Sequence, residues 1–181
     1  RSANTNQNPA FHAVFDGAPF AAAPAANKAN DLAKAVAGSD AFSLALNLSN
    51  LTFKNLENKG NPWGQNAKDR TNWIDEVDFD VPVYGKDVES FAGYEYLFWV
   101  GCAGAYEDRA KATTKAVAEL LHVAGVRYMV LGDGETCTGD PARRAGNEFL
   151  FQMQAMQNVE VLNEVGAKKI VVTCPHCMNT I

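Results

Sequence analysis

Four cysteines are the residues of this chain whose type and spacing say most about chemistry. They stand at positions 102, 137, 174 and 177, and the first 101 of the 181 residues contain none. Cys174 and Cys177 form a C-x-x-C pair, a spacing used by metal sites, iron–sulfur clusters and redox disulfides alike. The pair by itself therefore leaves several chemistries open.

Composition excludes some classes of function. Four cysteines in 181 residues are too few for a small disulfide scaffold, and the start of the chain lacks the apolar core of a secretory signal, so we expect a reducing, cytoplasmic setting. A net charge of −5 argues against nucleic acid as a partner. No run of about 18 apolar residues is present, so no membrane span is expected in this chain. Gly132–Glu135 has too few glycines for a dinucleotide site, and no serine, histidine and acid arrangement supports hydrolysis.

The elements that must position the cysteines begin at residue 94. Residues 96–100, 126–131 and 168–173 are short apolar runs that predict buried strands. Residues 107–124 and about 141–165 predict amphipathic helices, and Pro175 is suited to begin another. The apolar stripes expected to face the core are Val117, Leu120, Leu121 and Ala124 in the first helix and Ala145, Phe149, Met153 and Met156 in the second. This order predicts an α/β fold, a small parallel sheet with flanking helices in βαβαβ order.

Each cysteine follows the carboxyl end of a predicted strand. In an open parallel sheet these ends share one edge, where ligands bind, so we expect the four thiols to meet in space. Helices are predicted to start right after Cys102, Cys137 and Cys174, and their N-termini suit the negative charge of thiolates around a 4Fe-4S cluster or zinc. Arg109, Arg143, Arg144, Thr138 and His176 are expected to surround the ligands without binding the metal. The arginines have an alternative role, pairing with Asp108, Asp140 or Glu148 on a solvated face. Asp108 and Glu135 also flank the cysteines and are interpreted as caps and turn residues.

Two interpretations of the cysteines compete with a shared metal centre. They can be small buried apolar side chains of a βαβ fold, or Cys174 and Cys177 can form a redox disulfide. The second interpretation leaves Cys102 and Cys137 without a role.

The first half of the chain is less regular. Residues 1–50 are rich in alanine and asparagine and predict an irregular arm with short helices at 31–37 and 42–56, the second carrying Leu44, Leu48 and Leu51. Residues 51–93 are interpreted as an acidic lead-in, in which Gly60–Gly64 ends the helix. Trp63 and Trp73 are expected to pack this segment onto the domain at 94–181.

Three stretches resemble the cysteine-rich CCG domain of heterodisulfide-reductase-like iron–sulfur oxidoreductases. They are Val100–Arg109, Glu135–Gln152 and Lys169–Thr180. Lys54–Gly64 is similar to the lead-in of membrane-bound members, which pass electrons from electron-transfer flavoprotein to a quinone. The resemblance covers roughly residues 50–181 and implies that Cys102, Cys137, Cys174 and Cys177 bind an iron–sulfur cluster.

The resemblance has two departures. The family's usual Cys-Cys-Gly motif is here Cys137-Thr138-Gly139, so one ligand of a five-cysteine non-cubane centre is missing and a 4Fe-4S cubane is expected, with zinc as the alternative. The chain also lacks the ferredoxin-like domain and the second CCG domain of its relatives, so we expect a fragment that is not catalytically complete alone. The resemblance implies an electron-transfer module at the cytoplasmic face of a membrane, relaying electrons from a flavoprotein towards a quinone site outside this chain. The alternatives are a zinc-stabilised interaction domain and a thiol–disulfide reductase.

Overall fold

The computed structural model describes residues 40–181, with side chains from residue 47 onwards. Residues 49–181 form a compact unit. The helix predicted at 31–37 lies outside the described residues. In chain order the elements are α3 (Asp40–Lys59), the 3-10 helix η1 (Ala67–Glu76), β1 (Tyr96–Trp99), α4 (Gly101–Tyr106), α5 (Asp108–Val123), β2 (Tyr128–Met129), the 3-10 turn η2 (Gly132–Gly134), α6 (Asp140–Arg144), α7 (Glu148–Val165), β3 (Ile170–Val172) and α8 (Pro175–Met178).

The three strands form the parallel sheet that the sequence predicts. Their order is β2-β1-β3, so the first strand in the chain is the central one. Leu97 of β1 is in register with Met129 of β2 and with Ile170 of β3. A central strand is covered on both faces, which explains why β1 reads as a continuous apolar run rather than as an alternating one.

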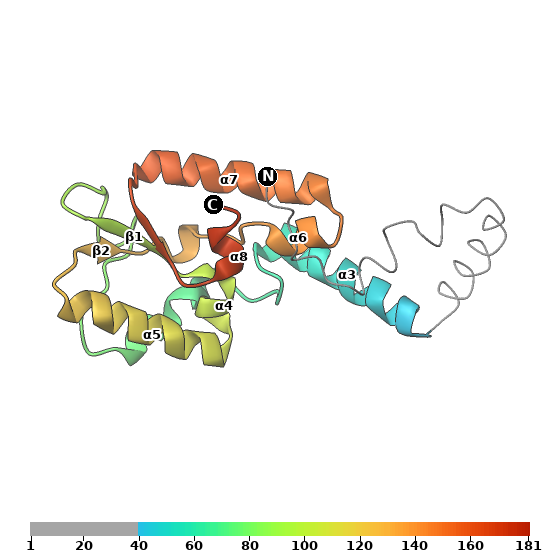
Figure 1. The fold of residues 1–181 in the computed structure, drawn as a ribbon, viewed down its shortest axis with the longest axis horizontal. Helices are drawn as coiled ribbons and strands as arrows, with labels where there is room; N and C mark the ends of the chain where they lie inside the picture. The colour runs from blue at the N-terminus through green and yellow to red at the C-terminus, as the bar shows by residue number, and fades with distance from the viewer. Residues whose placement is uncertain (1–39) are drawn as a thin grey trace, which may run out of the picture. The chain divides into compact units, whose positions relative to one another are not determined.

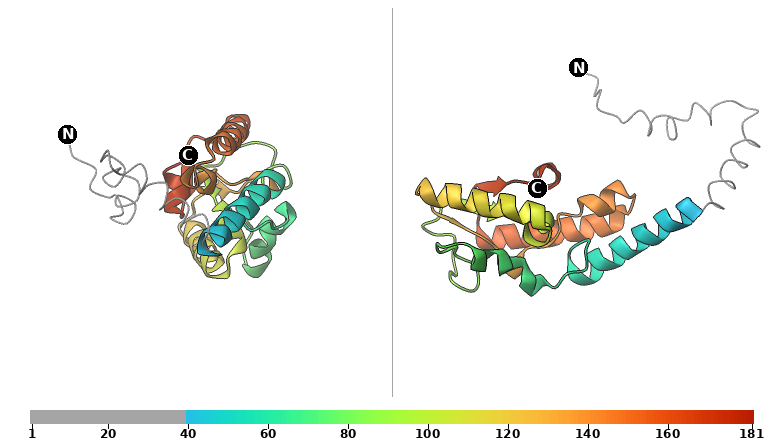
Figure 2. Two further views of the ribbon diagram at one scale, coloured as in Figure 1. Left: turned by 90° about the vertical axis from the view of Figure 1, so that its right-hand side faces the viewer. Right: turned by 90° about the horizontal axis from the view of Figure 1, so that it is seen from below.

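Side chains of β1 alternate between two buried layers. Phe98 belongs to the cluster that contains Ala118 of α5, and Trp99 belongs to the cluster that contains Val165 of α7. The ribbon views accordingly place α5 on one side of the sheet and α7 on the other (Figures 1 and 2). The sheet is thus enclosed between two helices, as the predicted fold class requires.

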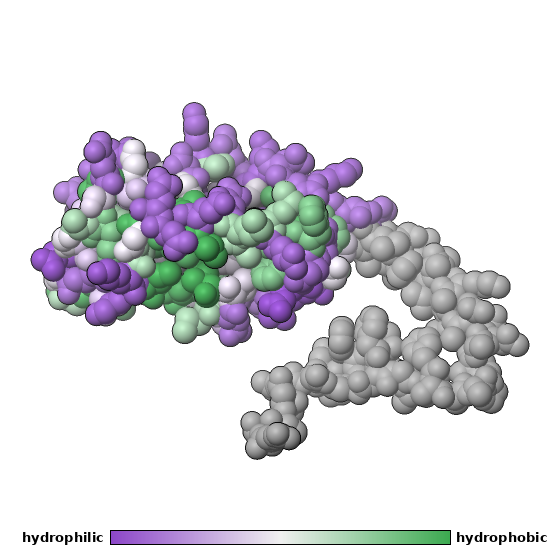
Figure 3. Space-filling view, turned by 90° about the horizontal axis from the view of Figure 1, so that it is seen from above, coloured by the Kyte–Doolittle hydropathy of each residue, from purple (hydrophilic) through white to green (hydrophobic). Residues whose placement is uncertain are grey.

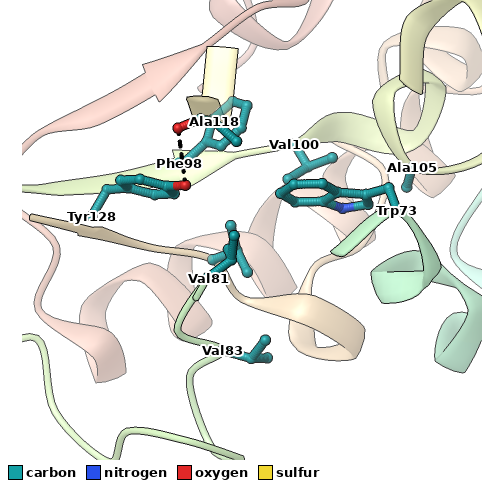
Figure 4. Close-up of a cluster of buried hydrophobic side chains, with 9 residues drawn as sticks. Trp73, Val81, Val83, Phe98, Val100, Ala105, Ala118 and Tyr128 are labelled. Atoms are coloured by element: carbon teal, nitrogen blue, oxygen red, sulfur yellow. Dashed lines mark hydrogen bonds between the residues drawn. The ribbon is translucent and has the colours of Figure 1, made fainter. Parts of the chain in front are cut away.

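The lead-in contributes to the same core. Trp73 of η1 is 1% exposed and packs edge-on against Phe98, with Val81 and Val83 nearby (Figure 4). Tyr128 closes the other end of this cluster, where its hydroxyl donates a hydrogen bond to the Ala118 carbonyl. The packing role predicted for Trp73 is confirmed, because burying an indole of this size stabilises the contact between segments.

The helix predicted from 141 to 165 is wrong as a single element. It is divided into α6 and α7 by Gly146, whose φ of +83° lies in the left-handed region that glycine tolerates. Asn147 then caps α7, since its side-chain oxygen accepts a hydrogen bond from the Leu150 amide. The chain direction changes at this point, and α6 is free to approach the cysteines.

The predicted apolar stripe of α7 faces solvent instead of the core. Phe149, Met153 and Met156 are 75, 53 and 65% exposed, whereas Gln154 and Asn158 are 5% exposed. Apolar side chains accordingly gather on the face of the molecule seen from the α7 side (Figure 3). The prediction is wrong because polar residues occupy the inner face of the helix, a possibility that hydrophobic periodicity does not register.

Several smaller expectations can be compared with the structure. The helix expected at 42–56 lies within α3, which ends at Lys59, directly before the predicted stop. Leu120, assigned to the buried face of α5, is 68% exposed, and Trp63 is 46% exposed rather than packed. Of the helices in residues 40–181, none combines the length and apolar character needed to cross a bilayer.

Candidate metal centre

All four cysteines line a single cavity of about 350 Å³. They are free thiols, as expected, and come from three segments that follow the three strands. The residues lining the cavity are Pro62, Trp63, Cys102, Ala103, Cys137, Thr138, Asp140, Pro141, Arg144, Cys174, His176 and Cys177. The predicted meeting of the cysteines at one edge of the sheet is therefore what the structure shows.

Cys102 lies in the first turn of α4, a short helix that the sequence analysis missed. The helix begins at Gly101, whose φ of +76° lets the chain leave β1 sharply. A Cβ at this position would lie 3.3 Å from the Cys177 sulfur. Glycine thus permits both the turn and the close approach of two cysteines that are far apart in sequence.

A buried ion pair supports this turn. The Glu135 carboxylate accepts hydrogen bonds from the amides of Val100 and Gly101, at 3.0 and 2.7 Å, and from Arg70 Nη1 at 2.9 Å. Arg70 Nη2 in turn donates to the Cys102 sulfur at 3.5 Å. The side chains of Arg70 and Glu135 are 2 and 1% exposed. One carboxylate therefore fixes the backbone before Cys102 and the guanidinium beside its sulfur.

The acid–base properties of the site follow from this burial. Hydrogen bonding with the Cys137 thiol lowers the pKa of Cys102; burial opposes this shift, and Arg70 favours it. The same hydrogen bond, together with burial, raises the pKa of Cys137. Burial raises the pKa of Glu135, while Arg70 and the two backbone amides oppose that shift. Cys102 is thus the member of this neighbouring pair that more readily becomes a thiolate.

Cys137 is held through its backbone. Its amide donates to the Gly60 carbonyl at 2.7 Å, and its carbonyl accepts from Asn158 Nδ2 at 3.0 Å. Thr136 Oγ1 donates to the other end of the same amide, Asn158 Oδ1, at 2.8 Å. The loop that carries Cys137 is therefore tied both to the end of α3 and to the buried face of α7. We refer to Cys102 and Cys137 as the inner pair.

Cys174 and Cys177 form an outer pair at the start of α8. Pro175 begins this four-residue helix, as predicted, with Cys174 as the residue before it. Cys177 is 7% exposed and packs with Trp99, whereas Cys174 is only half-buried. Burial, followed by the nearby Cys174, raises the pKa of Cys177. The outer pair is held mainly by its own short helix and by β3.

The predicted surrounding residues divide into two groups. Thr138, Arg144 and His176 line the cavity, where Asp140 pairs with Arg144 at 2.8 Å and with His176 Nδ1 at 3.1 Å. The alternative role of Arg144, an ion pair with Asp140, is thus also present. Arg109 is exposed and does not line the cavity, and the Arg143 guanidinium lies 4.8 Å from the centre of the Phe151 ring.

Four contributors were not identified as site residues from sequence. Arg70 and Asn158 carried no signal, because their partners lie 32 and 21 residues away along the chain. Glu135 and Trp63 were noticed but assigned to a turn and to packing. The position of Glu135, two residues before Cys137, was the one available clue.

The four thiols surround a space rather than converge on a point. Within residues 47–181, no three His, Cys, Asp or Glu side chains are grouped as ligands of a single metal ion. The donor set nevertheless comprises four sulfur atoms around one cavity with few polar walls. Such a set suits a soft metal centre of some size.

Comparison with protein families agrees with the position of this site. Residues 96–181 match the profile of the family described as "Cysteine-rich domain", or CCG, a range that includes all four cysteines. This part of the chain is a CCG domain. No solved structure matches the chain.

The CCG domain and its lead-in are similar to parts of several longer proteins. The chain is 43% identical to the "Probable iron-sulfur-binding oxidoreductase FadF" of Bacillus subtilis, over 68% of this chain and 18% of the relative. It is 44% identical to the "EtfAB:quinone oxidoreductase" of Syntrophomonas wolfei, over 70 and 18%. It is 32% identical to one subunit of the dihydromethanophenazine:CoB--CoM heterodisulfide reductase of Methanosarcina mazei, over 65 and 26%. The chain thus spans about a fifth to a quarter of these relatives.

Proposed function

We propose that the CCG domain is an electron-transfer module whose four cysteines hold an iron–sulfur cluster. The observation that carries the proposal is the shared cavity, which brings together thiols from three segments of the chain. The printed names of two relatives, an iron–sulfur-binding oxidoreductase and a quinone oxidoreductase, point in the same direction.

The residues of the cavity fit such a group. An iron–sulfur cluster needs four thiolates with room between them, and the four cysteines border a cavity of about 350 Å³. Pro62, Trp63 and Pro141 contribute apolar walls that limit water, and a drier site strengthens electrostatic interactions. When bound, the cluster supplies a one-electron carrier.

The protein side of electron transfer is largely positional. Glu135 holds the turn before Cys102, Asn158 holds the Cys137 loop, and α8 presents the outer pair. Fixed ligands keep the two oxidation states of a centre similar in geometry, which lowers the reorganisation that each transfer requires. We propose a 4Fe-4S cubane, because the chain offers four cysteines and has Thr138 where the family motif has another cysteine.

Partners and location follow from the same relatives. We propose that electron-transfer flavoprotein donates electrons to the CCG domain and that a quinone, bound by a part of the protein outside this chain, receives them. This path matches the name of the Syntrophomonas wolfei relative. Another relative is a "Probable membrane-anchored ferredoxin" of Chromohalobacter salexigens, 35% identical over 70% of this chain and 18% of the relative. A place at the cytoplasmic face of a membrane is consistent with both.

Metal and sulfide analysis tests the proposal. Protein purified without oxygen is expected to contain about four iron and four sulfide per chain and, after reduction with dithionite, to give an electron paramagnetic resonance signal. Cys102→Ser, Cys137→Ser and Cys177→Ser should each lower iron and sulfide, whereas Arg127→Met, at an exposed arginine, should not. Stoichiometric zinc without sulfide would overturn the proposal in favour of a zinc-stabilised interaction domain.

A second candidate is thiol–disulfide reduction at the outer pair. Its basis is the C-x-x-C spacing, the partial exposure of Cys174 and the similarity to a component of a heterodisulfide reductase. In this case Cys102→Ser would leave the reduction of a small disulfide by the domain intact, whereas the cluster proposal predicts that the centre is lost. The two candidates therefore differ at a single residue.

A further inference from the structure

The guanidinium of Arg70 is placed at the sulfur of one proposed ligand. Arg70 comes from η1, in the lead-in, and is the single buried arginine in the part of the chain with described side chains. Its Nη2 donates to the Cys102 sulfur at 3.5 Å, and its guanidinium lies 5.2 Å from the centre of the Tyr106 ring. These contacts bring a positive charge to the cavity wall.

Glu135 fixes the position of this charge. One of its oxygens accepts from both Arg70 Nη1 and the Gly101 amide, and the other accepts from the Val100 amide. The same carboxylate therefore positions the donor and the backbone that leads into Cys102. Any movement of the guanidinium relative to the sulfur would break at least one of these hydrogen bonds.

Burial of this ion pair needs a compensating interaction. Taking a guanidinium and a carboxylate out of water is costly, and apolar residues of similar volume often serve stability equally well. Arg109, Arg143 and Arg144, which follow the cysteines in sequence, remain exposed. The chain thus places its one buried arginine where it meets a sulfur atom.

We infer that Arg70 is a positioning residue that holds an N–H donor on the Cys102 sulfur and raises the reduction potential of the centre. The inference rests on the proposed function. An added electron makes a thiolate-ligated centre more negative, so a nearby donor and positive charge stabilise the reduced state more than the oxidised one. Glu135 has two opposed effects, because it anchors the donor and also adds a negative charge.

Midpoint potentials of four variants test this inference. The double variant Arg70→Met/Glu135→Gln removes both charges together, so it avoids leaving a buried carboxylate unpaired, and should lower the potential. Arg70→Lys keeps the charge but loses the planar fork and should lower it less. Glu135→Gln keeps the guanidinium, removes a negative charge and should raise it. Arg127→Met, whose side chain is 67% exposed, is the matched control and should leave it unchanged.

Opposite signs separate electrostatic tuning from general damage to the fold. Each variant is first checked for iron, sulfide and a cooperative thermal transition, and its potential is then measured by redox titration followed by electron paramagnetic resonance. A cluster-containing double variant with the wild-type potential would overturn this inference alone. If the double variant does not fold, unchanged potentials in Arg70→Lys and Glu135→Gln would overturn it. A wild-type protein that holds zinc and no sulfide would overturn the proposed function as well, so the two failures are distinguishable.

Discussion

The inner and outer cysteine pairs are held in different ways. The inner pair packs with Leu56 and Ala142 and receives hydrogen bonds from segments that are remote in sequence. The outer pair lies on a helix of four residues that follows an edge strand whose residues are all only partly buried. One side of the cavity is thus fixed by tertiary contacts, and the other is fixed mainly by local structure.

This difference indicates a division of labour in the site. Rigid contacts at the inner pair can set the electronic environment of a bound group, because they fix donors at a sulfur atom. At the outer pair, the half-buried Cys174 and the exposed His176 place the cavity near solvent, where an electron or a partner can reach it. The variants below test whether the inner pair is in fact the more constrained of the two.

Loss of the buried arginine should have the largest effect on stability. Arg70→Met leaves Glu135 buried without its ionic partner, and removal of one member of such a pair typically costs about 3–5 kcal/mol. Urea unfolding of the metal-free protein measures this change, and Arg70→Met/Glu135→Gln should recover most of it. If the single and double variants were equally unstable, the ion pair would not be what constrains the inner side.

This ion pair also marks the limit of what the sequence predicts. The strand order along the chain, the helix at Pro175 and the meeting of the four cysteines follow from local patterns and from the geometry of parallel sheets. Arg70 and Glu135 are 65 residues apart, and nothing in either local sequence indicates that they pair. The inner side of the site therefore depends on tertiary contacts, which a single sequence does not reveal.

The predicted face of α7 failed for a related physical reason. Phe149, Met153 and Met156 form the most apolar stripe, so periodicity assigned them to the core. The buried face instead carries Asn158, which is needed to hold the Cys137 loop, and this contact orients the helix. A polar residue with a specific partner thus outweighed a generic apolar stripe.

Gly101 is the point at which the two pairs approach each other. Gly101→Ala should destabilise the metal-free protein by about 1–3 kcal/mol, because a φ of +76° is unfavourable for alanine. It should also weaken cofactor binding, since the new methyl group would lie 3.3 Å from the Cys177 sulfur. Chemical unfolding and iron content measure the two effects.

Gly125→Ala is the matched control for Gly101→Ala. Gly125 has a φ of +66°, and a Cβ added there would have no atom within 4 Å, so the substitution carries backbone strain without a contact at the site. It should lower stability and leave the iron content of the folded protein unchanged. Equal iron content in the two variants would show that the approach of Gly101 to Cys177 does not matter for binding.

Two buried amides on α7 allow a smaller comparison. Asn158→Leu leaves the Cys137 carbonyl and the Thr136 hydroxyl without their partner and should cost about 1–2 kcal/mol. Gln154 is equally buried, yet neither its side-chain oxygen nor its nitrogen has a partner among the described residues. Gln154→Leu should therefore be neutral or stabilising in the same unfolding experiment. Equal losses would mean that Asn158 acts by packing rather than by holding the inner pair.

The smallest effect is expected at the rim of the cavity, near the outer pair. Arg144 also lies at the site, but its side chain is 60% exposed and its partner, Asp140, is four residues away on the same helical turn. Exposed pairs at this spacing contribute about 0.3–0.5 kcal/mol, so Arg144→Met should change urea unfolding by no more than this, and less at high salt. Solvent also screens its charge, so the midpoint potential should shift less than in the Arg70 variants. A larger shift at Arg144 than at Arg70 would reverse the comparison, because the exposed side of the cavity would then control the centre.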